Sequence, residues 1–166
     1  RSPGVYDFSV VDVTLKKKES RGMRVKGHAL VWHQALPSWV GSLSPPELRI
    51  ALEDHIRTVA GHYRRRVYAW DVVNEAIDDG QPGLRSTVFS RGLGPDYVAE
   101  AFRLARPGEA PEVVLEATYG WYWAVDALRA LGARVHLAHP LGVKAFEYRR
   151  VKNDVRDATD LADLLG

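Results

Sequence analysis

Residues 67–76, VYAWDVVNEA, constrain the fold of this chain most, because an apolar run stops abruptly at Asn74 and Glu75. Strands of parallel sheets are buried on both faces and read as near-continuous apolar runs. In α/β barrels, residues at the carboxyl ends of such strands carry the chemistry. The segment therefore predicts a buried parallel strand that ends on a candidate acid or base, Glu75. The structural alternative is that Glu75 caps the following helix or pairs with an arginine.

A second predicted strand, residues 24–33, RVKGHALVWH, places an imidazole and an indole together. Simple alternation assigns His28, Leu30 and Trp32 to one face of this strand. Sugar sites combine such groups, because pyranose rings stack on aromatic faces while imidazole, amide and carboxylate groups bind the hydroxyls. The pattern favours a sugar site near the end of this strand. A structural histidine at position 28 is the alternative.

Three segments, GHALVWHQALPSWV, VYAWDVVNEA and LRSTVFSRGLGPDYVAEAFRLAR, occur in this order. Together they resemble glycoside hydrolase family 10, the β-xylanases, over about residues 6–106. The resemblance implies an α/β fold that is part of a (β/α)8 TIM barrel, roughly its third and fourth strands with their helices. It also implies an endo-1,4-β-xylanase that hydrolyses the polysaccharide β-1,4-xylan with retention of configuration and without a cofactor or metal.

The same resemblance implies a role for each site residue. By motif position, Glu75 is similar to the general acid/base of the family. Three residues resemble those that bind the sugar next to the scissile bond: His28, Trp32 and Asn74. Among them, Asn74 resembles the residue whose amide binds the 2-hydroxyl of that sugar. Two residues resemble polar framework residues that hold the site in place: His33 and Asp71. We expect all six side chains near the ends of the two strands.

A retaining glycosidase also needs a second carboxylate, about 5–5.5 Å from the first, to attack the anomeric carbon. The family draws this nucleophile from a strand far downstream, and nothing after Arg106 resembles its motif. The first two strands of the family would lie before Tyr6, and Ala35 stands where the family usually has a glutamine for a more distant sugar. The sequence therefore predicts a truncated and impaired xylanase.

The remainder of the chain reads as a separate βαβ pattern from residue 112 to residue 140. Residues 110–165 resemble the N-terminal catalytic domain of DEDD-type insertion-sequence transposases, which have a RuvC/RNase H-like fold. That resemblance implies DNA as the partner and Mg²⁺ held by Glu116, Asp154 and Asp157, although the first aspartate of the set has no match. The alternative is a solvated acidic helix around Asp154 and Asp157.

These resemblances divide the chain into residues 1–106, a junction at 107–111 and residues 112–166. The junction is rich in Pro and Gly. We expect that the junction arose when an insertion element entered a xylanase gene. A misassembled sequence or a deliberate fusion would give the same pattern. A further hypothesis is that strands near 24–33, 67–74, 112–116 and 134–138 form one parallel layer, whose open edges favour self-association.

Composition sets wider limits. The 166 residues are 46% apolar and 27% charged, which suits one domain with a real core, and the net charge of +2 is too small to argue for nucleic acid. With no cysteine there is no disulfide. No apolar run is long enough for a membrane span or a signal peptide, although the family is usually secreted. Since the chain begins with Arg1, we expect a fragment or a processed product.

Three interpretations of function follow from the sequence. The chain is a partial xylanase that keeps the acid/base and part of one sugar subsite, a fragment of a transposase-type nuclease, or a non-functional chimeric product. The xylanase interpretation is favoured, because it covers the larger share of the chain and has the more complete local site.

Overall fold

The computed structural model describes residues 2–78, 80, 83–106, 112–116, 121–130 and 132–138. The chain divides into two compact units. Unit 1 comprises residues 1–76 and 86–105, and unit 2 comprises residues 77–85 and 106–166. The segment 77–85 therefore leaves unit 1 and belongs with the C-terminal part of the chain.

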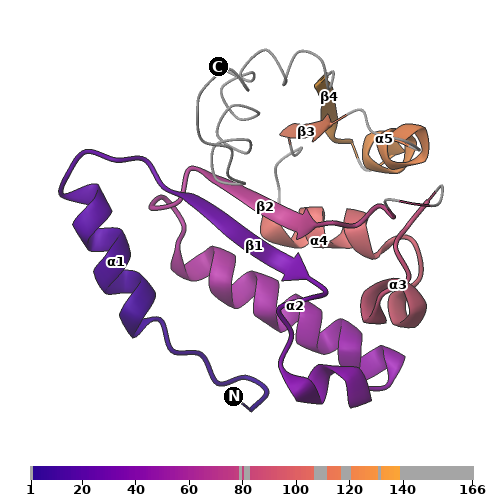
Figure 1. Ribbon diagram of the computed structural model, residues 1–166, viewed down its shortest axis with the longest axis horizontal. Coiled ribbons are helices and arrows are strands. Elements are labelled where there is room, and N and C mark those ends of the chain that lie inside the picture. The colour runs from indigo at the N-terminus through magenta and orange to yellow at the C-terminus, as the bar shows by residue number, and fades with distance from the viewer. Residues whose placement is uncertain are drawn as a thin grey trace. The chain divides into compact units, whose positions relative to one another are not determined.

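A pair of parallel strands forms the centre of unit 1: β1, Lys26–Trp32, and β2, Ala69–Asn74. Helix α2, Pro45–His62, packs along β1, and helix α4, Tyr97–Ala105, packs along β2 (Figure 1). The two helices also contact each other. Both strands fall within the predicted segments and run parallel, so these two predictions are confirmed.

Helix α2 supplies much of the core of unit 1. It begins at Pro45, where the backbone N–H of Ser44 donates to the Glu47 carboxylate over 2.8 Å and closes a capping box. Three of its apolar side chains recur every fourth residue and are buried: Leu48, Leu52 and Ile56. Burying a side chain of this kind contributes about 1.5–3 kcal/mol. The resulting apolar stripe holds α2 against the strand pair.

Three shorter elements complete unit 1: α1, Ser9–Glu19; the 3₁₀ helix η1, Ser38–Ser42; and α3, Val88–Leu93. Thr87 caps α3, since its hydroxyl accepts from the backbone N–H of Ser90 over 3.3 Å. Phe89 of α3 stacks against Tyr97 of α4, with ring centroids 5.8 Å apart. Helices α3 and α4 are thus joined by a buried aromatic pair.

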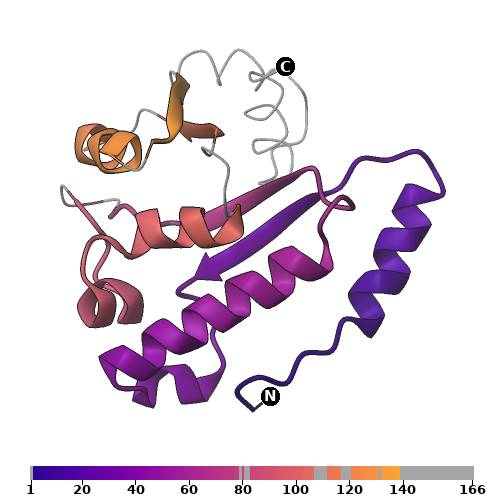
Figure 2. The same cartoon turned by 180° about the vertical axis from the view of Figure 1, so that it is seen from behind.

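Helix α1 lies beside the end of α2 (Figure 2), and polar side chains join the two helices. Asp12 lies 3.0 Å from the His62 ring and accepts from the Arg66 guanidinium over 3.0 Å. Arg66 also donates to Glu19, over 3.0 Å. The Phe8 ring, just before α1, stacks on His62 with centroids 3.9 Å apart. Charge and aromatic contacts therefore hold α1, together with the buried side chain of Leu15.

The simple alternation expected along β1 is wrong in the middle of the strand. His28 pairs with Asp71 but Val31 pairs with Val73, so three steps along β1 match two along β2. Such a bulge inserts one extra residue and re-aims the side chains that follow. Leu30 and Val31 are consequently both buried, although they are neighbours in sequence.

Unit 2 contains the predicted βαβ arrangement. Strands β3, Glu112–Glu116, and β4, Arg134–Ala138, are parallel, and α5, Trp121–Ala130, contacts both. The predicted single layer of four strands is wrong, because the described strands form two sheets of two strands each. Each pair forms its own hydrogen-bond ladder and contacts its own helices, α2 and α4 for the first pair and α5 for the second.

The close approach of the two strands predicts a strong effect of Gly27→Ala. A Cβ at Gly27 would lie 2.2 Å from Cε3 of the Trp70 ring, which belongs to β2. We expect the free energy of unfolding in urea to fall by about 1–3 kcal/mol, because a large ring must move. Gly61→Ala is the matched control, since nothing lies within 4 Å of a Cβ there. Equal stabilities of the two variants would contradict this packing.

The attachment of α1 predicts a dependence of stability on acid pH. The hydrogen bond with His62, followed by those with Arg66, lowers the pKa of Asp12 below its ordinary value. A lowered pKa in the folded state means that the contribution is present above the ordinary value and is lost as pH falls below it. We expect Asp12→Asn to flatten the acid limb of stability against pH in urea titrations. Asp126→Asn on α5 is the control, and an unchanged acid limb in Asp12→Asn would refute this role.

Candidate functional site

The carboxyl ends of β1 and β2 lie side by side and bring the predicted site residues together. Trp32 ends β1 and pairs in register with Asn74, which ends β2. Glu75 follows β2 directly, while His33 and Gln34 follow β1. Parallel pairing therefore places the two post-strand segments at the same edge of unit 1.

The carboxylate of Glu75 is the centre of this cluster. Its Oε2 accepts from Nε1 of Trp32 over 3.1 Å and from Nε2 of Gln34 over 3.0 Å. The Nε2 atom of His33 lies 3.8 Å from the same oxygen, beyond hydrogen-bond distance but within reach of an ionic contact. The Glu75 side chain is 41% exposed. A carboxylate held by directed donors and still open to solvent can exchange a proton with a bound ligand.

The imidazole of His28 on β1 is held by Asp71 of the neighbouring strand, β2. Its Nδ1 lies 2.8 Å from Oδ2 of Asp71, and Nζ of Lys26 donates to Oδ1 of the same carboxylate over 2.6 Å. The rings of His28 and Trp32 meet edge to face, with centroids 5.6 Å apart. Asp71 thus orients His28.

The structure brings together most of the predicted site residues through direct contacts. Trp32 and His33 contact Glu75, His28 contacts Trp32, and Asp71 contacts His28. Asn74 is placed by the pairing of its backbone with Trp32 and by its position next to Glu75. Two further residues contact these carboxylates although they were not predicted as site residues: Gln34 and Lys26. Lys26 precedes His28 by two residues on β1, and residues at this spacing share a face of a strand. This spacing is the sequence signal for a position of Lys26 near Asp71.

Neither a metal site nor a membrane span occurs in the part of the chain that the structure describes. Over those residues, no group of three or more His, Cys, Asp or Glu side chains is arranged to hold a metal ion. None of the helices there is long and apolar enough to cross a membrane.

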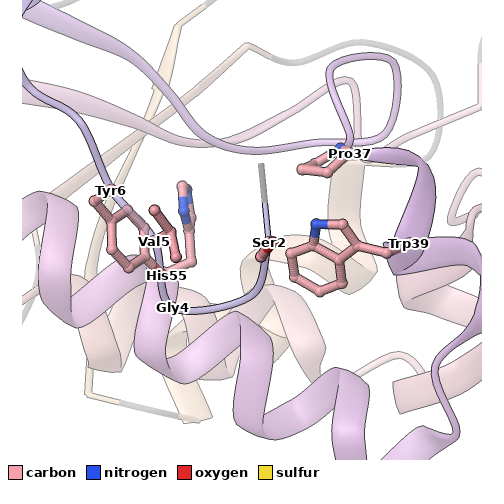
Figure 3. A pocket seen from close by; sticks show the side chains of 7 residues that line it. All are labelled: Ser2, Gly4, Val5, Tyr6, Pro37, Trp39 and His55. Carbon is pink, nitrogen blue, oxygen red and sulfur yellow. The ribbon is translucent and has the colours of Figure 1, made fainter.

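A pocket of about 260 Å³ lies elsewhere in unit 1, between the N-terminal segment, α2 and the loop after β1 (Figure 3). Burial and a hydrogen bond to Asp54 raise the pKa of Tyr6 to about 12, and burial lowers the pKa of His55. Its lining contains no carboxylate and consists of Ser2, Gly4, Val5, Tyr6, Pro37, Trp39 and His55. The titratable side chains of this lining are those of Tyr6 and His55, so the pocket differs from the carboxylate cluster at the strand ends.

Comparison with known proteins identifies a family. The family model described as glycosyl hydrolase family 10 matches residues 1–119. The chain is 41% identical to endo-1,4-beta-xylanase A of Humicola insolens over 123 residues, which are 72% of this chain and 32% of that protein. It is 40% identical to endo-1,4-beta-xylanase B of Paenibacillus barcinonensis over 147 residues, or 79% of this chain and 44% of that protein. The chain thus spans less than half the length of these relatives.

Solved structures of xylanases share the fold. Native xylanase 10B of Thermotoga maritima matches with a TM-score of 0.72 and 30% identity, over 98% of this chain and 54% of that chain. Xylanase 10B of Thermotoga petrophila, solved in complex with xylobiose, matches with a TM-score of 0.70 and 31% identity, over 82% of this chain and 46% of that chain. The fold of this chain is therefore that of part of a xylanase α/β barrel.

The resemblance of the C-terminal segment to transposases receives no support from these relatives. The family model continues past Arg106, where the family pattern was expected to end, and includes β3. Glu116 is the last residue of β3, and its backbone pairs with Ala138. The other two acidic residues of the implied Mg²⁺ set, Asp154 and Asp157, lie outside the described residues.

Sequence motifs, strand pairing and similarity to solved structures agree on one assignment. The family model covers most of the chain, and the xylanase structures match unit 1 together with residues beyond it. The chain belongs to glycosyl hydrolase family 10.

Proposed function

We propose that this chain carries the acid/base half of a retaining endo-1,4-β-xylanase site, which binds β-1,4-xylan at the carboxyl ends of β1 and β2. The observation that supports this most is the Glu75 carboxylate, which accepts from Trp32 and Gln34 at the end of the half-buried strand β2. The names of the relatives are consistent with this substrate, since they are endo-1,4-beta-xylanases.

In this proposal Glu75 exchanges the proton. It protonates the oxygen of the leaving sugar and then, as a carboxylate, activates the water that releases the retained sugar. Its exposure leaves room for a glycosidic oxygen to approach. Two carboxyl groups perform the whole reaction, so the proposed mechanism uses no metal or cofactor.

Three residues next to Glu75 would bind the sugar. The Trp32 indole offers a flat face to the pyranose ring, and the Asn74 amide would bind the 2-hydroxyl next to the scissile bond. When the Nδ1–H of His28 donates to Asp71, the Nε2 atom of the neutral ring can accept a hydrogen bond from a sugar hydroxyl. In this arrangement Asp71 and His33 support the site without contacting the reacting atoms.

The proposal requires a second carboxylate on the opposite side of the sugar ring. A carboxylate from another segment or from a second copy of the chain would supply it. Within unit 1 as described, β1 and β2 each have one strand neighbour, so each has an outer edge that a further strand can join. We include self-association through these edges in the proposal for that reason.

Hydrolysis and binding test separate parts of this proposal. We expect the purified chain to release phenol from an aryl β-xylobioside that needs leaving-group protonation, and Glu75→Gln to lower kcat/KM by at least about 100-fold. Calorimetric titration with xylotetraose should give similar affinities for both forms, because the amide keeps the size of the carboxyl group. Glu53→Gln is the control, since that carboxylate pairs with Arg57 on α2.

The outcomes differ in what they exclude. Hydrolysis that Glu75→Gln leaves unchanged would contradict the assignment of the acid/base. A folded chain that neither binds xylotetraose nor cleaves the aryl substrate would contradict the function as a whole. Binding without turnover would mean that the chain holds the acid/base half and that nothing supplies the nucleophile.

A further inference from the structure

Gln34 lies in the loop after β1, two residues beyond Trp32, and its amide contacts the proposed acid/base. We infer that Gln34 is a positioning residue: together with Trp32 it fixes Oε2 of Glu75 as a hydrogen-bond acceptor and thereby assigns the transferable proton to Oε1. The inference rests on the proposed role of Glu75 and adds which of its two oxygens gives the proton to the substrate.

Two N–H donors contact the Glu75 carboxylate, one from Gln34 and one from Trp32. Both N–H groups point to the same oxygen, at 3.0 Å from Gln34 and 3.1 Å from Trp32. An indole N–H and an amide NH₂ donate hydrogen bonds and do not accept them. A proton on Oε2 would face two donors and leave at least one of them without its acceptor. The protonated form of Glu75 therefore carries its proton on Oε1.

The backbone conformation and the exposure of Glu75 are reasons why its carboxylate needs positioning. The residue directly follows β2 with φ of 53°, in the left-handed region that a non-glycine residue rarely adopts. Its side chain is 41% exposed, so packing restrains its rotamer only in part. Trp32 at the end of β1 and Gln34 in the loop after it donate hydrogen bonds that restrain the Glu75 carboxylate. A misplacement of about 1 Å in a reacting group costs up to about 100-fold in rate.

Gln34 is uncharged. A neutral partner suits Glu75, because Glu75 must act first as an acid and then as a base. A lysine or arginine at this distance would favour the carboxylate over the protonated acid. A neutral amide donates to Oε2 in both forms, since the carbonyl oxygen of a protonated carboxyl group still accepts. Gln34 therefore holds the geometry through both steps of a retaining reaction.

The dependence of the rate on the leaving group tests this inference. Gln34→Met keeps the length of the side chain and removes the donor. We expect kcat/KM for xylotetraose, whose leaving sugar must be protonated, to fall by about 10- to 100-fold. The value for 2,4-dinitrophenyl β-xylobioside, whose leaving group needs no proton, should change by less than about 2-fold. Equal losses on both substrates, or no loss on xylotetraose, would overturn the inference.

Ser42→Ala is the control for general disturbance of this region, because the Ser42 hydroxyl donates to the backbone of Trp39 over 2.8 Å within η1. We expect this variant to keep the rates of the unsubstituted chain on both substrates. A loss in Ser42→Ala that equals the loss in Gln34→Met would also overturn the inference.

A spectroscopic readout separates this inference from the proposed function. The indole N–H of Trp32 shares its acceptor with Gln34, so its ¹H–¹⁵N resonance, assigned with Trp32→Phe, should move in Gln34→Met as well as in Glu75→Gln. If the unsubstituted chain shows no turnover, the rates cannot be compared and this resonance alone decides. A Trp32 resonance that Gln34→Met leaves in place would overturn the inference.

Discussion

The parallel pairing of β1 with β2 is the interaction on which the candidate site depends. It aligns Trp32 with Asn74 at the carboxyl ends of the strands, so that the residues after each strand meet at one edge. Glu75 and Gln34 come from segments 41 residues apart in sequence and hydrogen-bond only because of this register. Helices α2 and α4 secure the pair, since each packs on one strand and both contact each other. A shift of one residue in this pairing would separate Glu75 from both of its donors.

A second constraint is the way that polar groups support one another at this edge. Asp71 binds Lys26 and His28 with separate carboxylate oxygens, and His28 in turn contacts the Trp32 ring. Glu75 adopts a left-handed backbone conformation, which costs of order 1 kcal/mol for a residue with a side chain. Such conformations cluster at functional sites, where the surrounding contacts determine them. The two hydrogen bonds to the carboxylate are contacts of this kind.

The sequence predicted the parts of the structure that follow from local patterns. Apolar runs and one alternating segment located the four strands that the structure describes, and the abrupt end of one run identified Glu75 as a candidate site residue. The bulge in β1 was not predicted, because alternation carries no sign of an extra residue when Leu30 and Val31 are both apolar. Gln34 was missed for a different reason: the direction of a loop amide depends on how the loop leaves the strand. The pairing of the strands joins residues far apart in sequence, such as Trp32 and Asn74, and no single segment encodes it.

The central claim is that the edge formed by the ends of β1 and β2 binds a β-1,4-linked xylose oligomer. The most direct test is titration of the ¹⁵N-labelled chain with xylobiose, with the perturbed resonances mapped on unit 1. The proposed site predicts the largest perturbations at Trp32, Gln34 and Glu75, with smaller ones at His28. Perturbations confined to the pocket lined by Trp39 and His55, or none at millimolar sugar, would contradict the claim.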